Sequence, residues 1–321
     1  MNNSYSIILT KISSELTYCI DIITLIFGTI GNICNLILLT NKKLGKSSSI
    51  FYLLLVTIFQ LITILFCVIV RLTIDRFSYN LFNKSRIFCK IRYYFVIIFP
   101  SLSSYYMVLT TFDRYISRSN NIQIHWLSQQ KIAKIFSIIV FLLISLLSIH
   151  ILIYHDIYNN TCQIIPQNIY IFIFSLYFII LIIFLPHILM FIFTFLTILS
   201  LKKSQEQIRS LMIRRQLPQN HRKKARLEMK LFKIILIQVI LSIVLSLLRF
   251  VSYTYFIIHN AFTNGNINPN DFVLIGFSIQ LGGSLYFFSF STSFYVSVLS
   301  SQLFRHLFYQ RILSFYHYFT R

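Results

Sequence analysis

Long apolar stretches recur from one end of this chain to the other, and they limit the folds that it can adopt. We count seven, at residues 17–40, 49–73, 89–114, 133–155, 169–200, 232–258 and 272–299. An α-helix rises about 1.5 Å per residue, so each stretch is long enough to cross a hydrocarbon core about 30 Å thick. Transmembrane β-strands would instead read as alternating segments of about 10 residues, and we see none. The pattern predicts an all-α membrane protein, a bundle of seven transmembrane helices.

Lysine and arginine are distributed unevenly between the two sides of such a bundle. The loops at 41–48, 114–134 and 201–233, together with the tail after 300, carry 21 of the 29. Basic residues mark the cytoplasmic side, so the N-terminus is expected outside. The net charge of +21 then reflects topology and contact with an anionic leaflet, and we expect membrane lipid, not nucleic acid, as the partner of these charges.

The two chain ends and the glycosylation sequons fit the same orientation. Asn-x-Ser/Thr sequons at Asn2, Asn83 and Asn159 all fall on the side predicted to be outside, where glycosylation takes place. A cleaved signal peptide has a basic start, a short apolar core and a cleavage site of small residues. This combination does not precede the first stretch, so we expect no cleaved signal peptide. The predicted organisation is an extracellular N-terminus at 1–16, a seven-helix domain at 17–300, and an amphipathic helix with a cytoplasmic tail at 301–321.

The third stretch carries a cysteine at one end and a charged pair at the other. Cys89 precedes Arg114 by 25 positions, about 37 Å of helix, which places them at opposite membrane faces. Cys89 and Cys162 are the two cysteines expected outside the hydrocarbon on the oxidising side, whereas the other three lie in apolar helix. A Cys89–Cys162 disulfide is therefore predicted, and it would hold the second outer loop over the third helix.

At this point the residues resemble those of the rhodopsin-like (class A) G-protein-coupled receptors, over about residues 17 to 315. The Asp-Arg-Tyr triplet that closes the third helix in that family is intact as Asp113, Arg114 and Tyr115. The tripeptide alone is a weak signal, but its place at the inner end of the third of seven spans is specific. Pro186 in the fifth stretch also matches the family, and the segment SSQLFRHLFYQRIL reads as a short amphipathic helix along the inner leaflet.

Other positions depart from the family pattern and indicate a divergent member. Gln60 stands where most members carry an aspartate in the second helix, which argues against a sodium site. The sixth stretch lacks the usual Trp and Pro, and the seventh has SFYVS in place of Asn-Pro-x-x-Tyr. The family resemblance implies an intramembrane polar network, and ordinary interhelical hydrogen bonding would use the same residues: Asn32, Gln60, Ser293 and Tyr295.

The resemblance also implies a two-state element at the inner end. Arg114 would pair with Asp113 or Glu228 at rest and exchange them for a heterotrimeric G protein when the sixth helix moves away. Ile122 resembles the apolar loop residue that enters the G protein. The alternative is that Asp113 and Arg114 only anchor the helix at the membrane interface.

Arg249 lies inside the sixth stretch, in the outer third of the membrane. An arginine at a helix centre costs about 2.5–3.5 kcal/mol on insertion scales, so it should face a wet cavity or a partner. We expect contact with an anionic or carbonyl group of the ligand, or alternatively a hydrogen bond to Gln280 or Tyr286. Amine receptors carry an aspartate where this chain has Val96, and opsins need a seventh-helix lysine that is absent.

The predicted ligand is accordingly an extracellular peptide of acidic or carbonyl-rich character, as for neuropeptide receptors. Basic residues line the outer rim beside aromatic ones, although lipid headgroups could also account for those cations. The residues predicted to contact the ligand are Arg92, Tyr93, Val96, Arg249 and Gln280.

Other functional classes fit less well. A transporter or channel would show internal repeats and intramembrane acids, and the sequence has neither pattern. An intramembrane enzyme would need a catalytic motif such as HExxH or GxSxG, so we expect no catalytic residue, cofactor or metal. A seven-helix chemosensory receptor outside the rhodopsin-like class is the closest alternative. The interpretation as a rhodopsin-like receptor predicts a multi-pass protein of the plasma membrane.

Overall fold

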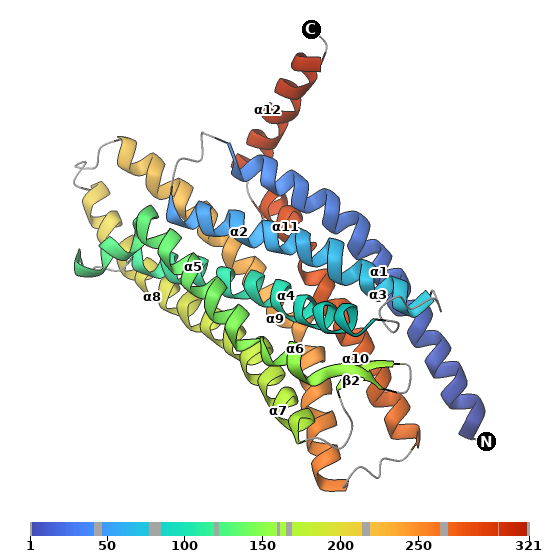
Figure 1. The fold of residues 1–321 in the computed structure, drawn as a ribbon. Helices are drawn as coiled ribbons and strands as arrows, with labels where there is room; N and C mark the ends of the chain where they lie inside the picture. The colour runs from blue at the N-terminus through green and yellow to red at the C-terminus, as the bar shows by residue number, and fades with distance from the viewer. Residues whose placement is uncertain are drawn as a thin grey trace.

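The computed structural model describes residues 2–41, 47–76, 85–118, 122–158, 161–164, 169–213, 219–263, 269–300 and 302–319. Within them the chain is almost entirely helical, with one short β-hairpin (Figure 1). The elements in chain order are α1 Asn2–Leu39, α2 Ser48–Thr63, η2 Ile64–Val68, α3 Ile69–Arg76, α4 Arg86–Ile116, η4 Ile122–Ser128, α5 Gln130–Leu147, α6 His150–Tyr154, β1 His155–Tyr158, β2 Thr161–Ile164, α7 Tyr170–Tyr177, η5 Phe178–Phe184, α8 Leu185–Ile213, α9 Gln219–Thr263, α10 Pro269–Ser289, α11 Ser293–Ser300 and α12 Gln302–Phe319.

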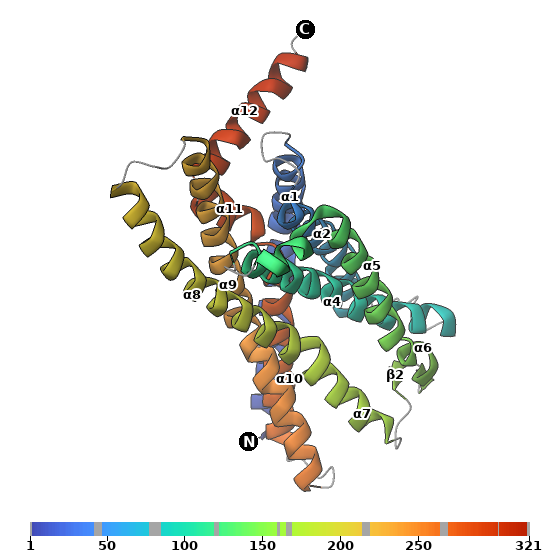
Figure 2. The ribbon, with the colours of Figure 1, turned by 90° about the vertical axis from the view of Figure 1, so that its left-hand side faces the viewer.

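These elements form the predicted seven-helix bundle. Among the described residues, six helices are long and apolar enough to cross a membrane, and α10 with α11, taken as one span bent by 51°, makes the seventh. Figures 1 and 2 show the spans running alongside one another, with the hairpin and the N-terminus at one end and α12 at the other. We call these the hairpin end and the α12 end.

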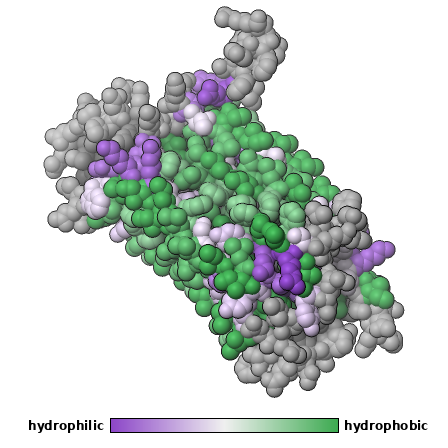
Figure 3. Space-filling view, viewed as in Figure 1, coloured by the Kyte–Doolittle hydropathy of each residue, from purple (hydrophilic) through white to green (hydrophobic). Residues whose placement is uncertain are grey.

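Apolar side chains lie both inside this bundle and on its surface. Val56, Leu102, Ile235 and Phe304 belong to a buried cluster around α4, which packs against α2 and α8. Other apolar residues of the spans, such as Leu146 and Val244, are exposed. Figure 3 shows a broad hydrophobic band between hydrophilic residues near the two ends, as expected where the surrounding solvent is hydrocarbon.

The first helix begins earlier than the first apolar stretch. α1 starts at Asn2 and runs without a break through the segment predicted as a separate N-terminal region. No glycine precedes Gly28 and no proline precedes Pro100, so nothing in the sequence ends the helix. Its 38 residues extend for about 57 Å, nearly twice the hydrocarbon thickness.

The fifth span is irregular just before its proline. The π-helical turns of η5 end two residues before Pro186. A proline has no N–H to donate and its ring clashes with the carbonyl oxygen four residues earlier, so the helix widens in the preceding turns. The irregularity before this proline therefore takes the form of a π-helical segment.

The seventh span bends without a proline. Three hydroxyl groups around the bend donate to nearby backbone carbonyl oxygens: Ser289 to Tyr286, Ser291 to Phe288, and Thr292 to Ser289. Such side-chain bonds compete with the helical hydrogen bonds and favour a local bend. The bend separates α10 from α11 and brings Ser293 to the first position of α11.

The hairpin lies against α4 at the hairpin end. β1 and β2 pair antiparallel, with Ile157 opposite Cys162. The predicted disulfide is present: Cys89 and Cys162 are joined, with their Cα atoms 5.6 Å apart. The Tyr93 hydroxyl also donates to the carbonyl oxygen of Cys162, so the hairpin is attached to α4 by both a covalent bond and a hydrogen bond.

Candidate functional site

At the α12 end, three serine hydroxyls surround the carboxylate of Asp113. Ser48 and Ser128 donate to Oδ1 at 2.6 and 2.8 Å, and Ser49 donates to Oδ2. The serine run that begins α2 provides two of these donors, while Ser47 caps the same helix by accepting the Ile50 N–H. The third donor comes from η4, so Asp113 connects α4 to α2 and to the connection that follows α4.

The sequence analysis did not identify these serines. Their signal was present, because a serine cluster directly before an apolar stretch is a typical helix N-terminus. Since α2 and α4 run antiparallel, that terminus lies level with the last turn of α4, where Asp113 is found. A serine-rich helix start that lies opposite an Asp-Arg pair could therefore have predicted the hydrogen bonds to Asp113.

The other predicted residues of this end lie on three elements. Arg114 is buried in the last turn of α4, and Tyr115 stacks on Phe193 of α8 with ring centroids 6.4 Å apart. Ile122 is the first residue of η4 and Glu228 belongs to α9. The side chains of Ile122 and Glu228 lie outside the described residues.

Near the middle of the bundle, three helices are joined by neutral polar groups. Ser293 of α11 donates to Gln60 Oε1 of α2 at 2.6 Å and accepts a hydrogen bond from Gln238 Nε2 of α9. All three side chains are buried. Gln60 and Ser293, predicted from the sequence to share a network, thus come together, and Gln238 is a member that the sequence analysis missed.

Two further predicted polar residues connect α1 to the seventh span. Asn32 Nδ2 donates to the carbonyl oxygens of Gly28 and Phe290, at 2.9 and 3.1 Å. The Tyr295 hydroxyl donates to the carbonyl oxygen of Phe27 at 3.0 Å. The Asn32–Phe290 and Tyr295–Phe27 bonds hold α1 against the region of the bend.

Toward the hairpin end, Arg249 of α9 is enclosed by aromatic rings. Its guanidinium carbon lies 4.4 Å from the Tyr286 ring centroid and 4.8 Å from that of Phe178, with Tyr253 and Phe287 within 6 Å. Nε and Nη1 are buried and have no hydrogen-bond partner among the described residues. Arg249 meets Tyr286 through the ring face, not through the hydrogen bond considered as an alternative.

Two glycines of α10 allow this close packing. A Cβ atom at Gly282 would lie 2.8 Å from the backbone N and Cα of Arg249, so only glycine lets α9 approach this closely. A Cβ atom at Gly283 would lie 2.5 Å from Nη1 of Arg71. The glycine pair therefore brings two arginines, from α9 and α3, to the same turn of α10.

These two arginines differ in their partners. Arg71 Nε lies 2.9 Å from Oδ2 of the buried Asp21, and its Nη2 donates to the carbonyl oxygen of Gln280 at 2.8 Å. Gln280 Oε1 accepts a hydrogen bond from Ser13 of α1, so this predicted ligand residue lies beside α1 and Arg71. Asp21 neutralises Arg71, and Arg249 remains as a positive charge without a carboxylate among the described residues.

The remaining predicted ligand residues lie on α4 beneath the hairpin. Arg92 is buried, with its guanidinium carbon 4.6 Å from the Tyr93 ring centroid, and the Tyr93 ring lies 4.4 Å from that of His155. The pKa of His155 is lowered to about 4, chiefly by burial and also by the nearby His150 and Arg92 charges, while a hydrogen bond to the backbone of Ile151 acts in the opposite direction. Val96 packs against a further cluster of buried apolar residues, separate from the one around α4, which includes Tyr286 and Phe287.

The predicted glycosylation sites cannot be compared with the structure in detail. Asn2 is the first residue of α1, and its side chain is outside the described residues, as are Asn83 and Asn159. Within the described part of the chain, no three His, Cys, Asp or Glu side chains gather as a metal site would require.

A comparison with known protein families gives a match. A family model described as "7 transmembrane receptor (rhodopsin family)" matches residues 31–280, which is more than half of the chain. No curated protein matches the sequence.

Proposed function

Because the chain belongs to the rhodopsin family of seven-transmembrane receptors, we propose that it binds an extracellular peptide at the hairpin end and activates a heterotrimeric G protein at the α12 end. Receptors of this family are multi-pass membrane proteins that signal through G proteins. The observation that carries the proposal is the guanidinium of Arg249, two of whose nitrogen atoms are buried without a hydrogen-bond partner among the described residues. It lies on the helix whose other end bears Glu228. One helix would thus carry both the ligand contact and the switch.

The proposed ligand group is a carboxylate or a carbonyl oxygen. Buried N–H groups that lack acceptors are costly, and an acceptor from a ligand removes that cost. A carboxylate would bind the guanidinium through charge-assisted hydrogen bonds, and the surrounding rings would exclude water. Arg92, Tyr93 and Val96 on α4 would form the opposite wall, below the hairpin. A peptide offers both kinds of oxygen, which favours it over an amine.

The proposed switch lies at the other end of the same helices. Asp113 is fixed by its three serine donors, so the end of α4 stays with α2 and η4 when α9 moves. In the proposal Arg114 pairs with Glu228 at rest, and the outward movement of α9 breaks this pair and the Gln238–Ser293 bond. The cleft so opened would admit the G protein, with Tyr115 and Ile122 at its edge. A ligand can drive this only by binding the open state more tightly.

The orientation and the membrane are part of the proposal. The uneven distribution of Lys and Arg supports an extracellular hairpin end and a cytoplasmic α12 end. Sequons on the outward segments support glycosylation at Asn2, Asn83 and Asn159. We assign the chain to the plasma membrane because a receptor for a peptide in the extracellular fluid must be exposed there.

The function is tested by expressing the full chain with a panel of G-protein biosensors and a peptide library. We expect at least one peptide to activate at least one G protein. Arg114→Ala should abolish that response at unchanged surface expression, whereas Arg305→Ala, at the exposed face of α12, should retain it. A response that survives Arg114→Ala would contradict the switch.

A second variant tests the resting state. Glu228→Gln removes one charge, so basal signalling should rise severalfold because the proposed ion pair is lost. Glu206→Gln, another acid of the same connecting region, serves as the control and should leave basal signalling as in the wild type. Unchanged basal and stimulated signalling in Glu228→Gln would disprove the proposed pairing.

A further inference from the structure

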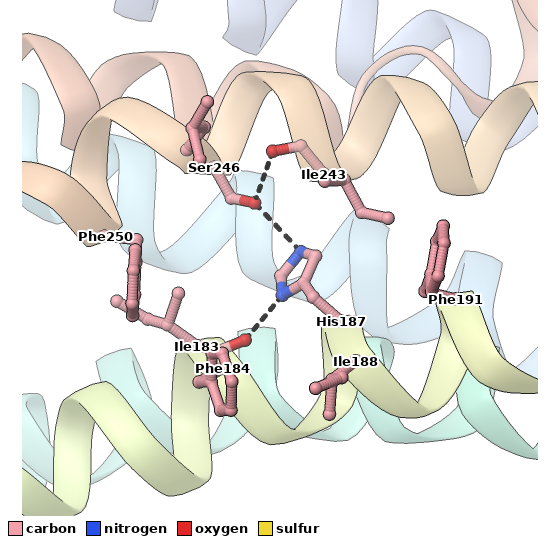
Figure 4. A pocket seen from close by; sticks show the side chains of 9 residues that line it. Ile183, Phe184, His187, Ile188, Phe191, Ile243, Ser246 and Phe250 are labelled. Atoms are coloured by element: carbon pink, nitrogen blue, oxygen red, sulfur yellow. Dashed lines mark hydrogen bonds between the residues drawn. The ribbon is translucent and has the colours of Figure 1, made fainter.

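A groove between the fifth and sixth spans faces outward from the bundle (Figure 4). It has a volume of about 240 Å³ and is lined by nine residues from η5, α8 and α9. Seven of them are apolar, and the two polar ones are His187 and Ser246. The lining contains no carboxylate, lysine or arginine, so the groove suits an uncharged group.

The groove opens toward lipid. Phe184, Phe191 and Leu247 on its walls have exposed fractions of 46%, 60% and 56%, and such residues in a membrane span face hydrocarbon. His187 and Ser246 lie within two residues of the centres of the apolar spans 170–200 and 232–258. The polar floor of the groove is therefore close to the bilayer midplane, about 15 Å from either edge of the hydrocarbon.

The hydrogen bonds in this floor leave one acceptor open. His187 Nδ1 lies 2.6 Å from the carbonyl oxygen of Ile183, which can only accept, so Nδ1 carries the proton. Nε2 then accepts from Ser246 at 3.0 Å or from Ser242 at 3.3 Å. Ser246 Oγ can also donate to the Ser242 carbonyl oxygen. In each arrangement Ser246 Oγ is a donor, and no described residue donates to it.

We propose that the groove binds a lipid whose acyl chain carries a hydroxyl group near its middle, with that hydroxyl donating to Ser246 Oγ. A hydroxyl group in hydrocarbon is costly unless it is hydrogen-bonded, so the groove offers such a lipid a bond that the surrounding bilayer lacks. An unmodified acyl chain can fill the same apolar walls but gains nothing from the polar floor. A lipid with its headgroup at the interface reaches the midplane with the middle of its chain.

This site is separate from the proposed ligand site and from the G-protein switch. Its residues lie on the lipid side of η5, α8 and α9, whereas Arg249 is enclosed by rings from α9, α10 and η5. Occupancy can be measured without any signalling readout. The proposal therefore holds or fails independently of the proposed function.

The test uses the purified full chain in phosphatidylcholine nanodiscs and two photoreactive, alkyne-tagged probes. One is stearic acid with a hydroxyl group at mid-chain, and the other is the same probe without the hydroxyl. We expect the hydroxylated probe to label peptides containing residues 183–191 and 243–250 about three- to tenfold more strongly, as one membrane hydrogen bond allows. Equal labelling by the two probes would show that the groove accepts any acyl chain and would overturn the proposal.

A serine variant locates the contact. Ser246→Ala should reduce labelling by the hydroxylated probe to that of the plain probe, while Ser242 can still donate to His187. Ser278→Ala is the matched control, because Ser278 donates to the carbonyl four residues earlier on another helix, and it should keep the preference. A preference that persists in Ser246→Ala would also overturn the proposal. The comparison of the two probes on the wild type needs no variant and stands if Ser246→Ala does not fold.

Discussion

At the scale of single residues, the proposed ligand site contains a buried positive charge, the guanidinium of Arg249. Within the described part of the chain, Nε and Nη1 of Arg249 are buried without acceptors, and four aromatic rings contact the guanidinium through their faces. Cation–π contacts contribute about 0.5–2 kcal/mol each at most, less than a buried charge requires. The ligand-free protein is therefore expected to be less stable with Arg249 than with an apolar residue of similar length.

Replacing Arg249 should separate stability from binding. We expect Arg249→Met to raise the free energy of unfolding of the ligand-free protein by about 1–3 kcal/mol, because an unsatisfied charge is removed and methionine packs well among rings. Peptide affinity should fall about 10- to 100-fold. Thermal unfolding and ligand titration measure the two effects. Arg86→Met is the control, because Arg86 is an exposed arginine at the same end, and it should change neither the stability nor the peptide affinity. An Arg249→Met variant that is less stable than the wild type would contradict this account.

The second residue-scale prediction concerns His155. Its pKa is lowered to about 4 from an ordinary value of 6.5, chiefly by burial, so protonation favours the unfolded state. Stability is fully present above pH 6.5 and is lost as the pH falls toward 4. Between pH 7 and pH 5 the loss should be about 2 kcal/mol. Unfolding midpoints at both values, compared with His155→Phe, measure it, and an equal pH dependence in the two proteins would refute the assignment.

At the scale of elements, α9 and α10 are in contact because α10 has a glycine where they are closest. This contact is specific to Gly282, since a Cβ atom at Gly276, six residues earlier on the same helix, would have no neighbour within 4 Å. The seventh span is also shaped by its hydroxyl groups, which bend it without a proline and place Ser293 between Gln60 and Gln238. Both features position Arg249 and the central network relative to each other.

Gly282 and Gly276 provide a matched comparison. Gly282→Ala should destabilise the protein by about 1–3 kcal/mol, because the added Cβ would overlap the backbone of Arg249. Gly276→Ala should instead stabilise it by about 0.5–1 kcal/mol through lower chain entropy in the unfolded state. Thermal unfolding of the two variants in the same detergent measures the difference. Equal effects would mean that α9 and α10 do not pack as described.

At the scale of the whole molecule, the bundle and its disulfide were predictable from the sequence. Apolar length predicts membrane spans because every span must cross the same thickness of hydrocarbon. The Cys89–Cys162 pair was predictable because these two cysteines were expected on the same side of the membrane and outside the hydrocarbon. The serine donors to Asp113, the aromatic rings around Arg249 and the role of Gln238 were not predicted. These depend on the rotation and register of neighbouring helices, which hydropathy does not encode. The bend at Ser289–Ser293 escaped because its cause is hydroxyl bonding, not proline.

The orientation of the whole bundle is a separate prediction. An epitope inserted within 205–225 should be unreactive on intact cells and reactive after permeabilisation, because this segment holds many of the basic residues. An epitope added before Asn2 should show the opposite behaviour. If the epitope within 205–225 were labelled on intact cells, the bundle would have the opposite orientation, and the proposed direction of signalling would be wrong.

The bond between Cys89 and Cys162 has a practical consequence for producing this protein. It connects the hairpin to α4, and it forms only where thiols are oxidised. Material made in a reducing compartment would contain all seven helices but would lack the covalent attachment of the hairpin above Arg92 and Tyr93. Expression through a eukaryotic secretory pathway, with reductant left out of every purification buffer, is therefore the sensible route to samples for ligand screening.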